Sequence, residues 1–135
     1  LKHLRQITPP GSIAHAFVGS RQQAQQAIDL GLKLGFGGAM TFGRATRLRA
    51  LAQSLPMDAI VLETDAPDIP PHWLYVTAKE RQTGAEMVCN SPVELPRIGC
   101  TLAALRGMTP DAVRAVTTAN AQAALPKLAL LTATG

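Results

Sequence analysis

The first half of the chain alternates between short apolar runs and segments that repeat apolar side chains at helical spacing. The runs at 12–17, 32–39 and 59–63 are typical of buried strands. Residues 20–31 and 44–54 have the spacing of amphipathic helices. This order, with short connections, predicts a parallel sheet with right-handed crossovers. Glycines at the end of the second run, Gly37 and Gly38, indicate that the backbone there comes close to another group.

The second half opens with a segment, 67–92, that has no clear period and contains three prolines in its first six residues. We expect a long loop here, on the active-site side of the domain. Long loops in compact domains are usually functional or disordered. Two helices are predicted after it, one ending at Gly107 and one starting at Thr109. Their inward-facing side chains are expected to be Leu95, Ile98, Leu102 and Leu105 in the first, and Val113, Val116 and Ala123 in the second. Residues 1–6 are typical of the end of an amphipathic helix.

Composition narrows the class of protein. The 135 residues suffice for a single domain, 1–135, with a modest core. The content of 47% hydrophobic and 16% charged residues excludes a disordered chain. The net charge of +4 favours the approach of an anionic partner without identifying one. The longest uncharged apolar stretch, 128–133, is far too short for a membrane span, and no secretory signal opens the chain. Cys89 and Cys100 are interpreted as free thiols in a reducing compartment, so we expect a cytoplasmic protein without a membrane partner.

Two polar residues follow predicted strands. His15 closes the first strand and Asp65 follows the third. Reactive residues collect at the carboxyl ends of parallel strands, so this pair can hold a divalent ion, and Asp65 can accept a proton from the attacking water. The alternatives are a hydrogen-bonded core histidine at 15 and an aspartate at 65 that only caps a turn.

Several segments resemble the TatD family of metal-dependent hydrolases. They run in order and at sensible spacing over about residues 7–125, and they read IAHAFVGS (13–20), FGGAMTF (36–42), LETDAPD (62–68), NSP (90–92) and TANA (118–121). The LETDAP signature matches outright, whereas Ala16 and Val18 replace the cysteine and serine of the family. The resemblance implies a (β/α)8 TIM barrel that hydrolyses DNA phosphodiester bonds with one or more divalent ions. The chain would be the last three strands of that barrel with their helices.

The resemblance also implies residue roles. His15 would be the metal ligand at the end of the sixth strand, and Asp65 the ligand and proton acceptor at the end of the eighth. Glu63 should face the same side as Asp65 by strand alternation, where it would support the site or pair with a lysine or arginine. Asn90 occupies the position of an Asn-x-Pro motif near the site. His plus carboxylate ligands suit Mg, Mn or Zn.

Other residues leave alternatives open. Arg44 opens the densest basic cluster, with Arg47 on the same predicted helix face, and it can meet a DNA phosphate or be a solvated residue. The aromatic residues Trp73 and Tyr75 can stack on bases or simply pack the loop. His72 is interpreted as an exposed loop residue rather than an extra ligand.

Part of the family pattern has no counterpart here. The His-x-His, the Glu and the further His of the earlier strands would precede Leu1, and the chain does not begin with methionine. We therefore expect a fragment that is inactive alone and that self-associates or needs the missing half, because three parallel strands expose two edges. The alternatives are a hydrolase of the same barrel that acts on an amide, lactone or ester, and a non-catalytic truncated homologue that acts by association.

Overall fold

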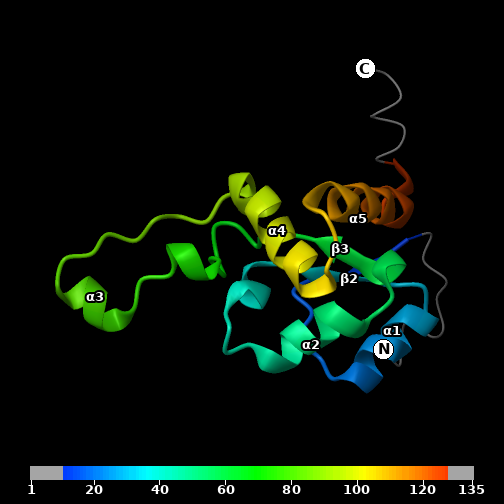
Figure 1. Ribbon diagram of the computed structural model, residues 1–135, viewed down its shortest axis with the longest axis horizontal. Helices are drawn as coiled ribbons and strands as arrows, with labels where there is room; N and C mark the ends of the chain where they lie inside the picture. Colours follow the sequence, from blue (N-terminus) through cyan, green and yellow to red (C-terminus); the bar gives the residue numbers. More distant parts are fainter. Residues whose placement is uncertain (1–10, 128–135) are drawn as a thin grey trace, which may run out of the picture.

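A three-stranded parallel sheet forms the centre of the computed structural model, which describes residues 11–127 (Figure 1). The strands are β1 (Ile13–Ala14), β2 (Lys33–Phe36) and β3 (Ile60–Leu62), in the order β1-β2-β3. Leu34 lies opposite Ala14 on one side and Ile60 on the other. The predicted parallel sheet is confirmed, although each strand is shorter than its apolar run. The expected helix at 1–6 lies outside the described residues.

Helices pack against this sheet, and two of the main ones begin at a side-chain cap. The main helices are α1 (Arg21–Asp29), α2 (Thr46–Ser54), α4 (Leu95–Arg106) and α5 (Pro110–Ala124). Ser20 and Gln23 form a reciprocal capping box at α1, and the Thr109 side chain accepts a hydrogen bond from the Ala112 amide at α5. Helix α4 packs against both α2 and α5, and Arg106 at its end donates hydrogen bonds to the backbone of Gln53 and Leu55. None of the helices within 11–127 is long and apolar enough to cross a membrane.

The core lies between one face of the sheet and the helices. Alternation along β2 and β3 directs one set of side chains into this core and leaves Gly35 on the opposite face. The largest fully buried side chains are Leu34, Phe36, Met40, Leu55, Ile60, Ile98, Leu102 and Val113. Short 3₁₀ turns connect the elements: η2 (Gly38–Thr41), η3 (Met57–Ala59), η4 (His72–Leu74) and η5 (Pro92–Glu94).

The segment 67–92 leaves the body of the molecule as an arm (Figure 1). The sequence predicts a long loop here, and the structure shows two short elements within it, η4 and a helix, α3 (Ala78–Gln82). Thr77 and Glu80 form a capping box at the start of α3. The Thr-x-x-Glu spacing of these residues is typical of the start of a helix, but the segment has no apolar stripe that would indicate one. At the root of the arm, the Trp73 indole donates a hydrogen bond to Glu94 (2.6 Å) beneath the guanidinium of Arg97.

The expected stripe of α5 is partly wrong. Val113 is buried, but Val116 is half-buried and Ala123 is exposed. The buried face instead consists of Val113, Thr117, Asn120 and Ala124, because two polar residues on it are hydrogen-bonded. The Asn120 amide donates to the carbonyl oxygens of Met57 and Ile60, both at 2.7 Å, and so ties α5 to the start of β3.

Replacing Asn120 by alanine should destabilise the protein by about 2 kcal/mol, because it removes both hydrogen bonds from the Asn120 amide to the carbonyl oxygens of Met57 and Ile60. Urea unfolding followed by circular dichroism measures this as a lower transition midpoint. Gln122→Ala, an exposed position on the same helix, is the matched control. Equal midpoints for the two variants would show that the Asn120 hydrogen bonds do not hold α5 on the sheet.

Candidate metal centre

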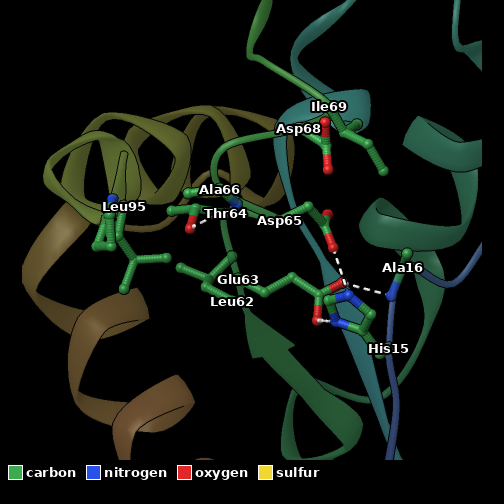
Figure 2. A pocket seen from close by; sticks show the side chains of 11 residues that line it. His15, Ala16, Leu62, Glu63, Thr64, Asp65, Ala66, Asp68, Ile69 and Leu95 are labelled. Carbon is green, nitrogen blue, oxygen red and sulfur yellow. Dashed lines mark hydrogen bonds and ion pairs between the residues drawn. The ribbon is translucent and has the colours of Figure 1, made fainter. Parts of the chain in front are cut away.

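Three side chains from the ends of β1 and β3 meet at the carboxyl edge of the sheet (Figure 2). His15 follows β1, and Glu63 and Asp65 follow β3. One ligand atom from each lies within 4.8 Å of the others, which makes this the one such group of three found among residues 11–127. The structure thus brings together His15 and Asp65, the predicted ligands, and Glu63, which the sequence placed on the same side as Asp65.

The imidazole of His15 lies between the two carboxylates. Its Nδ1 atom is 2.7 Å from Oε2 of Glu63, and its Nε2 atom is 2.6 Å from Oδ1 of Asp65. The second oxygen of Glu63 accepts a hydrogen bond from the backbone amide of Ala16 (2.6 Å). Glu63 therefore fixes both the ring of His15 and the backbone that follows it. It pairs with a histidine rather than with the lysine or arginine considered as an alternative.

Burial divides the cluster into an exposed base and two sheltered acids. The His15 side chain is 66% exposed, so it is not a core histidine, whereas Glu63 and Asp65 are 14% and 6% exposed. The pKa of His15 is raised, chiefly by its hydrogen bond to Glu63 and then by the negative charges of both carboxylates. Burial raises the pKa of Glu63, and the Ala16 amide opposes this shift. Sheltered carboxylates require positive charge nearby, which an imidazolium or a divalent ion can supply.

One atom of the cluster fits a metal ligand in particular. Oδ1 of Asp65 is buried, and its contact with His15 is not aligned as a hydrogen bond. A carboxylate oxygen and an imidazole nitrogen that face each other in this way can both bind one cation. A histidine with one or two carboxylates suits Zn, Mn or Mg. The donor set therefore fits the divalent ion that the resemblance implies.

The backbone at the cluster is held in an unfavourable conformation. Ala16 and Asp65 have positive φ angles of 47° and 55°, a region that costs non-glycine residues of order 1–3 kcal/mol. Asn90, which is buried, donates hydrogen bonds to the carbonyl oxygens of Thr64 and Asp68 on either side of Asp65. Asn90 thus holds the turn that carries Asp65. The structure therefore places Asn90, the first residue of the Asn-x-Pro motif, next to the site.

Two glycines of β2 and its end make room for the carboxylates. A Cβ atom on Gly35 would overlap the Glu63 carboxylate, and one on Gly37 would lie 3.0 Å from Oδ2 of Asp65. The sequence indicated a close approach at Gly37, but it gave no sign of a role for Gly35 within the strand. That role appears only when the register places Gly35 opposite Val61, so that Glu63 reaches back across it.

A cavity of about 580 Å³ opens over the cluster. Its walls come from the strand ends, from Asp68 and Ile69 at the start of the arm, and from Leu95 at the start of α4 (Figure 2). Pro92, the first residue of η5, also lines it. Both ends of segment 67–92 therefore lie at the candidate site, while its middle projects away (Figure 1).

The basic cluster does not form one helix face. Helix α2 begins at Thr46, so Arg44 lies outside it and cannot share a helical face with Arg47. Arg47 and Arg49 donate hydrogen bonds to the carbonyl oxygens of Val18 and Met40. Arg44 lies instead over the rings of Phe42 and Tyr75, away from the walls of the metal cavity. His72 is exposed and lies outside the cluster, as expected.

A parallel sheet with a histidine and carboxylates at its carboxyl edge is typical of α/β metal-dependent hydrolases. Comparison with known proteins makes the class specific. A family model described as TatD related DNase matches residues 1–126, and the chain belongs to this family.

Individual relatives agree with this assignment. The chain is 38% identical to the 3'-5' ssDNA/RNA exonuclease TatD of Salmonella typhimurium over 114 residues. This alignment covers 84% of this chain and 41% of that protein. It is 50% identical to an uncharacterized metal-dependent hydrolase of Haemophilus influenzae over 58 residues. That alignment covers 43% of this chain and 22% of the relative. The crystal structure of YjjV, a TatD homologue from Escherichia coli K12, matches with a TM-score of 0.75 at 32% identity, over 90% of this chain and 43% of YjjV. The chain thus spans less than half the length of these relatives.

The variant Gly35→Ala should weaken the binding of Mn²⁺ by roughly tenfold or more, because groups that orient metal ligands affect affinity on that scale. The added methyl group displaces the Glu63 carboxylate from His15, while alanine in a strand leaves the fold intact. Titration calorimetry measures the affinity, and thermal unfolding checks the fold.

Gly43→Ala is the matched control, because a Cβ atom there meets nothing within 4 Å and the residue has no positive φ angle. If Gly35→Ala binds Mn²⁺ as tightly as Gly43→Ala does, Glu63 does not position the ligand.

Proposed function

We propose that this chain forms the last three strand–helix units of a (β/α)8 barrel that hydrolyses DNA phosphodiester bonds with a divalent metal ion. The observation that supports this most directly is the convergence of His15, Glu63 and Asp65 at the carboxyl edge of a parallel sheet. In such barrels the active site lies at that edge. The name of the Salmonella relative, an exonuclease of single-stranded DNA and RNA, favours a phosphodiester substrate.

In this proposal His15 and Asp65 hold the ion, which is Mg, Mn or Zn. When bound, such an ion polarises the phosphate and lowers the pKa of water. The carboxylate of Asp65 accepts the proton that the attacking water loses. Glu63 acts on the site through His15, because its hydrogen bond to Nδ1 fixes the ring so that Nε2 faces Asp65.

The chain supplies only part of this site. Catalytic metal sites usually have three or more protein ligands, and in the proposal Glu63 is engaged with His15 and the Ala16 amide rather than with the ion. Among the described strands, β1 and β3 each pair on one side only. We therefore propose that further strands complete the barrel and contribute the remaining ligands. On its own, the chain should be inactive.

The full-length protein should degrade single-stranded DNA when Mg²⁺ or Mn²⁺ is added, and a chelator should abolish the reaction. Asp65→Asn and His15→Ala should each lower kcat by about a hundredfold or more, because they remove the proton acceptor and a metal ligand. The release of nucleotides from a labelled oligonucleotide measures the rate. Asp29→Asn, an exposed carboxylate on α1, should leave it unchanged.

Two results would overturn the proposed function. One is unchanged cleavage in the Asp65→Asn variant. The other is metal-dependent hydrolysis of amide, lactone or ester substrates without cleavage of DNA, which would assign the same barrel to another bond.

The isolated 135-residue chain should self-associate or aggregate, because β1 and β3 present unpaired edges. In addition, one face of the sheet would be covered by side chains of other strands only in a complete barrel. Sedimentation velocity should detect dimers or larger species. A sharp monomeric boundary together with a cooperative thermal transition would contradict an incomplete barrel.

A further inference from the structure

A second cavity, of about 370 Å³, adjoins the metal cavity. The two share one wall residue, Ile69, which lies beside Asp68 at the edge of the site in Figure 2. Ile69 is 43% exposed and has a positive φ angle of 44°. A ligand that extends away from the metal cluster past Ile69 would therefore enter the second cavity.

Aromatic rings from two elements form a wall of this cavity. Phe42 follows η2, and Tyr75 follows η4 at the root of the arm. Their rings meet edge to face, with centroids 5.6 Å apart and planes at 82°. Tyr75 remains 44% exposed, so much of its side chain is available to a ligand. Trp73 differs, because it is hydrogen-bonded to Glu94 and covered by Arg97 as part of the arm's packing.

The framework beneath these rings is fixed by backbone contacts. The hydroxyl of Thr41 accepts a hydrogen bond from the amide of His72 (2.8 Å) and donates one to the carbonyl of Gly38 (2.6 Å). Gly38 has no side chain, so the arm's first residues pack directly on η2: a Cβ atom there would overlap the carbonyl of Ile69. The positions of Phe42 and Tyr75 are thus set by the fold and not by a free loop.

Arg44 gives the cavity a positive charge. Its guanidinium carbon lies 5.2 Å from the centre of the Phe42 ring and 5.8 Å from that of Tyr75. Within residues 11–127, no carboxylate forms an ion pair with it. A cation held over aromatic rings without an anionic partner suits a ligand that combines an aromatic ring with a negative charge.

We propose that Phe42, Arg44 and Tyr75 form a subsite for the nucleotide next to the one whose phosphate lies at the metal cluster. The base stacks on Tyr75, and Arg44 binds the adjoining backbone phosphate. This inference rests on the proposed function. The substrate it specifies is single-stranded, because a base that is paired and stacked in a duplex is not free to enter the cavity. Stacking accepts every base, so the subsite selects strand structure rather than sequence.

The test measures the binding of fluorescent oligonucleotides to the full-length protein in a chelator, where no cleavage takes place. Fluorescence anisotropy compares an oligothymidylate with an abasic oligomer of equal length and charge. Tyr75→Ala should weaken binding of the oligothymidylate by about tenfold, within the range for loss of one stacked base, and should leave the abasic oligomer unaffected. Tyr75→Phe, which keeps the ring, should bind both as the wild type does.

Arg44→Ala should weaken the binding of both oligomers, because both carry phosphates. It should also reduce the slope of log affinity against log salt by about 0.7, the value for one phosphate contact with a single strand. Arg114→Ala is the charge-matched control, since Arg114 pairs with Asp111 on α5 and borders neither of the two cavities.

The outcomes separate this proposal from the proposed function. Equal binding of the two oligomers by the wild type, or equal losses for both in Tyr75→Ala, would overturn the subsite even if DNA is cleaved. A base-dependent loss in Tyr75→Ala would support the subsite even if no metal supports cleavage, in which case only the proposed reaction would fail.

Discussion

The candidate site depends on the double contact of Glu63. One carboxylate oxygen binds the ring of His15 and the other binds the Ala16 amide, so a residue at the end of β3 fixes both side chain and backbone at the end of β1. The contact crosses β2, which is possible because Gly35 has no side chain to block it. Without this link, His15 would be an exposed residue after a two-residue strand, free to adopt other rotamers. The geometry of the candidate ligands is therefore a property of the whole sheet rather than of any single strand.

Much of the framework could be predicted from local sequence. Buried strands of a parallel sheet have uninterrupted apolar runs, and the runs ending near His15 and Asp65 gave both the sheet and the edge at which these residues meet. The partner of Glu63 could not be predicted in this way. Alternation gives the face of a side chain, but the residue that it contacts depends on register with strands distant in sequence. The role of Gly35 could not be predicted for the same reason. Gly35 leaves room for the carboxylate of Glu63, a residue that is distant in the sequence.

The errors have physical causes of the same kind. The sequence predicts an apolar stripe on α5, but Thr117 and Asn120 are buried there because their side chains are hydrogen-bonded. Thr117 donates to the carbonyl oxygen of Val113 one turn earlier in α5, and Asn120 donates to those of Met57 and Ile60. The sequence gives no helical period in the arm, because α3 buries no apolar residue and starts at the capping box of Thr77 and Glu80. The apolar spacing of 44–54 predicts a helix that starts at Arg44, whereas α2 starts at Thr46 and Arg44 lies before it, over the rings of Phe42 and Tyr75. In each case a contact of a polar or charged side chain outweighs the apolar pattern.

The same edge of the sheet links stability to ligand binding. Two sheltered carboxylates and two non-glycine residues with positive φ angles are unfavourable on their own, and they persist because the surrounding contacts impose them. A cation bound beside Asp65 would offset the negative charge of the cluster, and it would stabilise the folded state by an amount that rises with its affinity. The turn at Asp65 thus links the conformation of the chain to ligand binding, because the residue that carries a candidate metal ligand also carries strained backbone.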